Sequence, residues 1–372
     1  MKTLITNIGQ LVTPRGSSAL AGRSMSDLCV LGETRLLVAN GRIASIGTFR
    51  SEETPDQIID AEGGVVLPGL IDPHRHLPAL RGPVGEGAGP SPIERTLRRA
   101  AAMGTVGMEI KSSDAEGDVI SAIDRARRAA ESTPLRVWHT LLGWMENGHS
   151  IDRSERISAL IGEVIPRAKR RRTAAFCDAA CGGAGFSSRE AEAILRAGLG
   201  AGFRTKVHAL PGGSAEAASV AASLGAMSVD HVDEVPYRAM KALRKQSVVG
   251  VVLPARSLID STVYPPAREL IDQDLPVALG TDFGAYADGV ESLWVIIALA
   301  TRRLGISLAE AICAVTLNAA AALGSAEESG SVEVGKWADL VILDMDDYRD
   351  IPRCVGANPV RSTLIGGEQV AG

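Results

Sequence analysis

The sequence predicts a (β/α)8 barrel joined to a small composite β-sandwich domain that the two ends of the chain build together. Three observations favour this fold. Short apolar runs alternate with helical stretches from about residue 70 to 325, both chain ends show β-structure alone, and 45% of residues are hydrophobic although only 3% are aromatic. Aliphatic cores are typical of parallel sheets covered by helices. We expect residues 1–68 and 326–372 to form the β-domain and residues 69–325 the barrel.

The two chain ends are predicted to consist of short strands. Residues 3–8 and 28–31 are β-prone, and Asn40-Gly41 between RLLVA and RIASIG predicts a hairpin with a type I′ turn. Another short strand, GGVVLPG, ends at Pro68-Gly69, and residues 338–343 and 361–370 show a similar pattern. Because neither end carries a helical stretch of its own, we expect them to share one domain.

The middle of the chain is predicted to supply eight barrel strands. One precedes His74, and the seven that follow are VGMEIK, LRVWHTLL, AAFCDAA, FRTKVHA, AMSVDHV, VVGVVLP and LPVALGTD. The intervening segments have helical periodicity, and Ser187 with Glu190 and Ser307 with Glu310 fit capping boxes. Eight such units in about 250 residues is the size expected of a (β/α)8 barrel.

The net charge and the cysteine content indicate which partners and which cellular compartment to expect. The net charge of −5 argues against nucleic acid, and the basic run at residues 169–172 is interpreted as a solvated helix end. The five cysteines are odd in number and fit no disulfide framework or paired zinc motif, so we expect reduced thiols in a cytoplasmic protein. No signal-peptide core is visible at the N-terminus, and no apolar run reaches the roughly 18 residues that span a bilayer.

Polar residues end several of the predicted strands. His74 and His76 follow the first strand at positions i and i+2, so both imidazoles point the same way and can reach one ion. His208, His231 and Asp282 end later strands, on the face where barrel enzymes carry their active sites. Histidines with a carboxylate suit a first-row metal, zinc above all. We expect a metal-activated water as nucleophile and Asp282 as general base and then acid.

The segment VVLPGLIDPHRH resembles the amidohydrolase-superfamily signature, in which a strand delivers a His-x-His metal pair. NIGQLVTP, MEIKS, KVHA, SVDHV, YPPARELID, PVALGTDF and GSVEVGKWADLVILD extend the resemblance to the imidazolonepropionase family over nearly the full length. The resemblance implies His74, His76, His208 and Asp282 as metal ligands and His231 as a catalytic residue that polarises the reacting carbonyl. It also implies the composite β-domain, a homodimer, and ring-opening hydrolysis of a cyclic amide.

Departures from the family pattern cluster around the substrate. Leu210-Pro211 replaces the Asp-Glu that follows the strand-five histidine, so the family's catalytic Glu is absent. Four more family motifs are changed, at Ser113-Asp114-Ala115, Pro78-Ala79-Leu80-Arg81-Gly82, Cys181-Gly182-Gly183 and Phe283-Gly284-Ala285-Tyr286. We therefore expect retained hydrolytic chemistry on a different substrate. An aminohydrolase (deaminase) on the same scaffold and a catalytically inactive binding protein are the alternatives.

The expected substrate is a small molecule, and the candidates for binding it include arginines suited to a carboxylate. These candidates are Arg81, Lys111, His139, Arg256 and Tyr286. One divalent metal is expected, most simply zinc, with iron or manganese as alternatives and a second metal left open. No membrane or nucleic-acid partner is expected.

Overall fold

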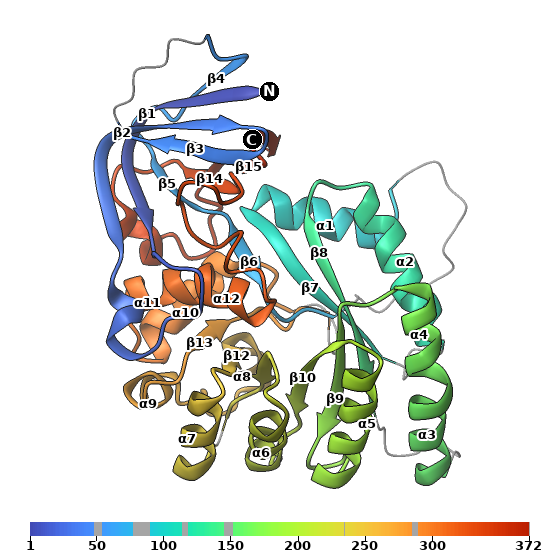
Figure 1. Cartoon of the computed structure of the whole chain (residues 1–372). Coiled ribbons are helices and arrows are strands. Elements are labelled where there is room, and N and C mark those ends of the chain that lie inside the picture. Colours follow the sequence, from blue (N-terminus) through green and yellow to red (C-terminus); the bar gives the residue numbers. More distant parts are fainter. Residues whose placement is uncertain are drawn as a thin grey trace.

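The computed structural model describes residues 1–47, 54–76, 90–113, 118–144, 152–233, 235–284 and 289–371. Within them the strands form two separate sheets, one built by the chain ends and one by the middle (Figure 1). Both termini lie in the first sheet, at the top of Figure 1. The predicted barrel with a composite β-domain is confirmed.

The sheet of the chain ends is mixed and has the order β16-β15-β14-β5-β1-β2-β3, with β4 paired to β1. Its strands are β1 (Lys2–Thr13), β2 (Cys29–Ala39), β3 (Arg42–Ile46), β4 (Gln57–Asp60), β5 (Val65–Pro68), β14 (Leu340–Leu343), β15 (Val360–Ile365) and β16 (Glu368–Ala371). β3 bonds back to the segment before β14, because Ile43 N donates to Lys336 O at 2.9 Å. The sheet thus curls around one aliphatic core.

The predicted hairpin turn is confirmed. Asn40 and Gly41 have φ of 51° and 77°, which is the type I′ geometry, and they join β2 to β3 with Ala39 opposite Arg42. β2 is longer than expected, since residues 28–31 and 35–39 belong to one strand. Pairing with the twelve-residue β1 continues past Glu33, and the register of this pairing shifts between Ile5 and Ile8 of β1, where Asn7 has a φ of 53°.

The second sheet is the barrel, and all neighbouring strands in it run parallel. In order they are β6 (Leu70–Asp72), β7 (Thr105–Ser113), β8 (Arg136–Gly143), β9 (Phe176–Cys181), β10 (Arg204–Ala209), β11 (Ser228–Asp230), β12 (Val249–Val252) and β13 (Val277–Leu279). Each of the eight corresponds to a run predicted from the sequence. Helices follow the strands and cover the outside of the sheet (Figure 1).

The α-helices are α1 (Pro92–Ala102), α2 (Val119–Glu131), α3 (Arg153–Ala159), α4 (Ile165–Arg171), α5 (Ser188–Gly200), α6 (Ser214–Leu224), α7 (Tyr237–Lys245), α8 (Pro254–Asp260), α9 (Ala267–Asp272), α10 (Leu293–Arg303), α11 (Leu308–Ala314) and α12 (Leu317–Ala322). A π-helical segment, η3 (Leu160–Val164), joins α3 to α4, and η1 (Gly22–Ser26) and η4 (Tyr348–Arg353) are 3-10 helices. Both predicted capping boxes are present, at the starts of α5 and α11. The basic run ends α4, as expected.

The barrel closes between β6 and the segment after β13. Asp72 accepts hydrogen bonds from Thr281 N at 3.1 Å and Thr281 Oγ1 at 2.5 Å. Just beyond, Asp282 N donates to His74 O at 3.1 Å and His76 N donates to Phe283 O at 2.9 Å. These bonds join the first and last barrel segments at the level of the predicted metal ligands.

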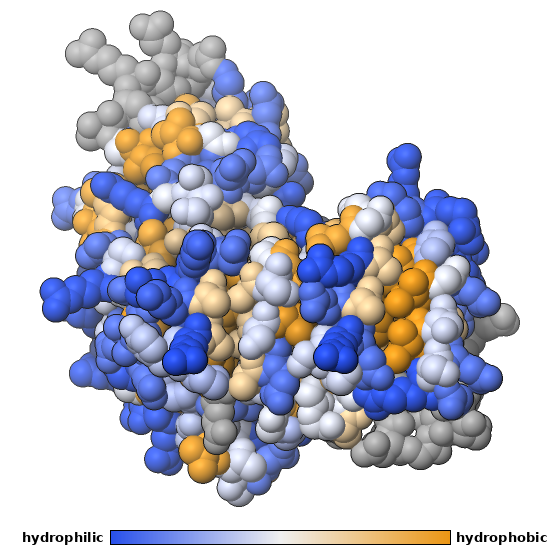
Figure 2. Space-filling model, turned by 60° about the horizontal axis from the view of Figure 1, so that its bottom comes forward, coloured by the Kyte–Doolittle hydropathy of each residue, from blue (hydrophilic) through white to orange (hydrophobic). Residues whose placement is uncertain are grey.

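Most large apolar side chains among the described residues are buried between the barrel strands and their helices or inside the composite sheet. The face in Figure 2 is mostly hydrophilic, with apolar residues in small groups between charged ones. Among the described residues, no helix combines the length and apolar character needed to cross a membrane. The five cysteines are all unpaired.

Candidate metal centre

The structure brings the five predicted residues together at one end of the barrel. His74 and His76 follow β6, His208 lies in β10, His231 follows β11, and Asp282 follows β13. The Nε2 atoms of His74 and His76 are 3.2 Å apart, and Asp282 Oδ1 lies 3.4 Å from the first and 3.6 Å from the second. One ion could therefore be held by all three residues.

His208 and His231 complete the cluster from the opposite side. Their ring centroids are 4.5 Å apart, and each lies about 5 Å from the ring of His74. His74, His208 and His231 each offer a ring nitrogen within 4.8 Å of the others. The histidine predicted as catalytic thus lies directly beside the predicted ligands.

The backbone at two of these residues is in the left-handed region. His231 has φ of 61° and Asp282 has φ of 54°. Non-glycine residues rarely adopt this conformation, and it costs of the order of 1–2 kcal/mol. At both positions it turns the chain out of a strand while the side chain stays at the barrel mouth, and such strain is characteristic of functional sites.

The donor atoms fit a divalent first-row metal. His208 Nδ1, His231 Nε2 and Asp282 Oδ1 are buried without a hydrogen-bond partner among the described residues. Buried polar atoms are otherwise almost always satisfied. Burial, helped by the Lys111 ammonium group, lowers the pKa of His76 to about 3. Burial also lowers the pKa of His231 to about 3, although the Asp230 carboxylate opposes this shift. Neutral imidazoles are the form that binds metals.

Asp282 differs from the histidines in its protonation. Burial raises the pKa of this carboxyl to about 7, and the nearby Arg256 guanidinium opposes that rise only in part. A cation next to Asp282 would favour its ionised form. The residue is therefore suited to bind a metal and to exchange a proton at neutral pH.

Asp230 contacts the ring nitrogen of His74 that does not face His76 and Asp282. His74 Nδ1 lies 2.7 Å from Asp230 Oδ2, and both side chains are fully buried. Asp230 in turn lies 2.8 Å from the Nζ atom of Lys111. A carboxylate on the outer nitrogen of a metal-binding histidine fixes the tautomer and the orientation of the ring. Sequence analysis missed Asp230, and its signal was a polar residue within a strand that is buried on both faces.

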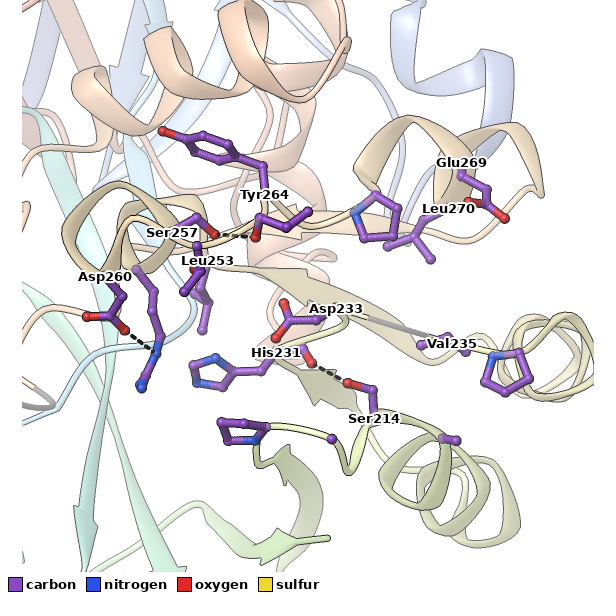
Figure 3. Close-up of a pocket in the computed structure, with 18 of the residues that line it drawn as sticks. Ser214, His231, Asp233, Val235, Leu253, Ser257, Asp260, Tyr264, Glu269 and Leu270 are labelled. Carbon is purple, nitrogen blue, oxygen red and sulfur yellow. Dashed lines mark hydrogen bonds and ion pairs between the residues drawn. The ribbon is translucent and has the colours of Figure 1, made fainter. Parts of the chain in front are cut away.

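A cavity of about 910 Å³ adjoins the cluster (Figure 3). His231 borders it, and the loops after β10, β11 and β12 together with α8 and α9 surround it. Its wall is largely apolar and includes Met240, Leu253 and Tyr264. This is the shape and lining expected of a small-molecule pocket.

Of the five residues predicted to bind substrate, the structure places Arg256 at the cavity. It lies on α8, and its Nε is 3.2 Å from Asp260 Oδ2. Its positive charge adds to the lowering of the His76 and His231 pKa values by burial and partly opposes the rise in the pKa of Asp282. Arg81 and Tyr286 fall outside the described residues. The other two, Lys111 and His139, are placed elsewhere.

Lys111 and His139 do not line the cavity. Lys111 is fully buried inside the barrel, where its Nζ atom contacts three carboxylates. His139 precedes Thr140, which points into the barrel and donates to Glu109 Oε1 at 2.5 Å. Because neighbouring residues of a strand face opposite sides, His139 points outward to the helices, where Arg127 is the charge that helps burial lower its pKa to about 4. The structure therefore places neither of these two predicted residues at this cavity.

Comparisons with known proteins agree with this geometry. The profile of the amidohydrolase family matches residues 91–371. The imidazolonepropionase of Geobacillus kaustophilus is 32% identical over 97% of this chain and 96% of its own length. That of Alkaliphilus oremlandii is also 32% identical, over 98% and 97%.

Solved structures show the same fold at lower identity. An amidohydrolase from a Sargasso Sea environmental sample superposes with a TM-score of 0.76 at 21% identity, covering 100% of this chain and 93% of that one. The triazine hydrolase from Arthobacter aurescens gives a TM-score of 0.76 at 18% identity, over 100% and 94%. With the family profile matched over most of its length and two full-length relatives above 30% identity, this chain belongs to the amidohydrolase family, close to the imidazolonepropionases.

Proposed function

We propose that this protein is a metal-dependent hydrolase that opens a small cyclic amide at a carbon–nitrogen bond other than a peptide bond. The observation that carries the proposal is the convergence of His74, His76, His208, His231 and Asp282 on one point beside a cavity. In this proposal His74, His76, His208 and Asp282 hold one divalent ion, zinc in the simplest case. A bound ion would supply Lewis acidity that makes a water molecule acidic near neutral pH.

The protein's own residues then divide the proton transfers. Asp282 takes the proton of the attacking water and returns it to the leaving nitrogen, so one carboxylate serves as base and then as acid. His231 is neutral at pH 7, borders the cavity, and has a buried Nε2 without a partner among the described residues. From there it can donate a hydrogen bond to the carbonyl oxygen of the substrate as negative charge develops.

Arg256 is proposed to bind a carboxylate on the substrate. It is the basic residue among those that line the cavity, and its charge is felt by the metal-centre residues. Guanidinium groups bind carboxylates through two parallel hydrogen bonds. A substrate anchored here would carry its acidic group on the β12 side of the reacting amide.

Amine release is the second candidate reaction, and one feature of the cavity disfavours it. Pro211 lines the wall at the position where the related pattern has a glutamate after the strand-five histidine. Proline offers no group that can shuttle protons to a leaving ammonia. The proposal therefore favours ring opening, in which the nitrogen stays attached to the product.

The test is a screen of metal-loaded protein against imidazolones, hydantoins, imides and lactams, each with and without a carboxylate side chain. Ring opening is followed by NMR, and ammonia is assayed in parallel. Asp282→Asn is expected to lower kcat by about 10²–10⁴-fold. Ammonia as the main product would identify a deaminase, and a protein that binds no divalent metal would be a binding protein without this chemistry.

Arg256→Met tests the carboxylate. It is expected to raise KM much more for acidic substrates than for neutral ones, because only the acidic ones lose an ion pair. Arg196→Met is the matched control, since Arg196 lies on the outer helix α5 and pairs there with Glu192. An equal effect on acidic and neutral substrates would show that Arg256 does not bind the carboxylate of the substrate.

A further inference from the structure

The barrel interior beneath the metal centre is filled by charged side chains. Glu109 and Lys111 of β7, Asp178 of β9, Lys206 of β10 and Asp230 of β11 are all fully buried. We call these five residues the interior ionic cluster. Barrels of this type normally fill the same space with branched aliphatic side chains. The cluster contains two amino groups, from Lys111 and Lys206, and three carboxyl groups.

Lys111 is the centre of the cluster. Its Nζ atom lies 2.6 Å from Asp178 Oδ2, 2.8 Å from Asp230 Oδ2 and 3.1 Å from Glu109 Oε1. All three carboxyl groups therefore lie within ion-pair distance of the same amino group. Lys206 bonds to Glu109 and to Pro73 O, the latter at 3.0 Å, and so ties the cluster to the residue before His74.

Stability alone does not account for such a cluster. Removing charges from water costs several kcal/mol per ion, and well-packed aliphatic replacements are often as stable or more so. We therefore expect the buried charges to have a role other than stabilising the fold. One carboxylate of the cluster, that of Asp230, contacts His74, which belongs to the candidate cation site.

Asp230 is the member that contacts a predicted metal ligand. Its Oδ2 lies 2.7 Å from His74 Nδ1 and 2.8 Å from the Lys111 Nζ atom, and its Oδ1 accepts from Ser228 Oγ at 2.6 Å. The carboxylate can only accept, so His74 must carry its hydrogen on Nδ1. The lone pair then lies on Nε2, the atom that faces His76 and Asp282.

We propose that Asp230 is a positioning residue that holds His74 in its metal-binding tautomer and orientation, and that Lys111 fixes Asp230 in place. The proposal rests on the proposed function, because it takes His74 to be a metal ligand. Asp178 provides the contrast within the same cluster. It is equally buried and contacts the same lysine, but its other oxygen accepts from Ala179 N, and it forms no hydrogen bond or ion pair with a histidine among the described residues.

The first test measures the tautomer of His74 in metal-free protein. Selective 15N labelling of the six histidines gives a spectrum in which Nδ1–H and Nε2–H forms have distinct nitrogen shifts. His74, assigned by loss of its signal in His74→Asn, is expected as the Nδ1–H form in the wild type and in Asp178→Asn. A mixture of forms is expected in Asp230→Asn. A wild-type His74 in the Nε2–H form would overturn the proposal.

The second test measures zinc affinity by competition with a chelating indicator. Asp230→Asn is expected to weaken zinc binding by about 10- to 100-fold. Asp178→Asn is expected to keep the wild-type affinity, although it removes a charge from the same lysine. Equal losses in the two variants would mean that the cluster matters only for packing, and unchanged affinity in Asp230→Asn would also overturn the proposal.

Two further measurements keep the test decisive. If Asp230→Asn does not fold, Ser228→Ala removes only the hydroxyl that orients Asp230, and a smaller loss of zinc affinity with a changed absorption spectrum of the cobalt-substituted protein is expected. An unchanged spectrum and affinity would contradict the proposal. A wild-type protein that binds no zinc or cobalt would refute the proposed function itself, whereas tight wild-type binding unaffected by Asp230→Asn would refute only the role of Asp230.

Discussion

The two sheets of this molecule fill their interiors in opposite ways. The composite sheet surrounds aliphatic side chains such as Ile5, Leu36 and Ile342. The barrel surrounds the interior ionic cluster, whose charges are as completely buried as those aliphatic groups. The aliphatic interior gains free energy from the hydrophobic effect, and the ionic interior gives up part of that gain to place charges beside the candidate metal centre.

The two interiors also differ in how they respond to substitution. An apolar interior tolerates exchange of one aliphatic side chain for another of similar volume. An ionic interior does not, because each charge depends on a particular partner. Burial alone would raise the pKa of Asp230, yet the ammonium groups of Lys111 and Lys206 and the bond to His74 hold it well below 3.8. Asp178, with Lys111 as its cation, has a raised pKa because burial prevails there.

The largest effect is expected when the ionic interior loses its central cation. Lys111→Met should lower the free energy of unfolding by about 3–5 kcal/mol, because three buried carboxylates lose a partner. Urea denaturation of metal-free protein measures the loss. Adding Asp178→Asn should restore part of the stability, whereas strictly additive losses would show that the charges do not act as a unit.

In the composite sheet the corresponding change is Leu36→Ala. Deleting this fully buried side chain should cost about 2–5 kcal/mol through lost burial and a residual cavity. Zinc affinity should stay at the wild-type value, since the residue belongs to the other sheet. A marked fall in zinc affinity in the folded variant would show that the two interiors are energetically coupled.

The pH dependence of zinc binding should distinguish Asp282 from the histidines of the candidate metal centre. In metal-free protein Asp282 has a pKa of about 7, so below pH 7 it is protonated and zinc must displace one proton. Zinc affinity should fall about tenfold for each pH unit between 7 and 5 and level off at higher pH. His76 and His231, with pKa values of about 3, stay neutral over this range and add nothing. Titration calorimetry in buffers of different ionisation enthalpy gives the proton count.

Two outcomes of that experiment are informative. Asp282→Asn should bind zinc more weakly and without this slope. A release of two or more protons near pH 6 in the wild type would mean that a histidine titrates there, against the pKa values that burial imposes on the cluster.

The smallest effect is expected at the hairpin of the composite sheet. Gly41 has φ of 77°, so Gly41→Ala places a side chain in a left-handed conformation at a cost of about 1 kcal/mol. Thermal unfolding measures this loss. Asn40→Gly removes a side chain from the same turn and should change stability less, because glycine adopts positive φ without strain.

Sequence patterns predicted the fold and the grouping of the five residues of the candidate metal centre, because both depend on regular spacing. The eight apolar runs, the Asn40-Gly41 turn and the residues at strand ends follow rules of period and position. The side of the strand on which Lys111 and His139 lie could not be predicted, since that depends on register against neighbouring strands. Lys111 pairs with Thr140 in β8 and faces inward, and His139 therefore faces outward.

Asp230 was missed for a related reason. Alternating charged residues in MEIK, FCDA, RTKV and SVDH are anomalous for strands buried on both faces, and this anomaly marks the interior ionic cluster. The partners within the cluster come from four strands whose relative stagger is set by barrel closure. Only the folded chain brings Asp230 to His74, which is distant from it in sequence.

The closure of the barrel has a consequence for how the protein is made. His74 and Asp282 lie on the two sides of the seam between β6 and the segment after β13, and Asp282 N donates to His74 O across it. During synthesis the ribosome releases the first of these residues long before the second. The four histidines of the candidate metal centre are therefore present in the growing chain before Asp282 is added, so the carboxylate would be the last of these donors to join the site.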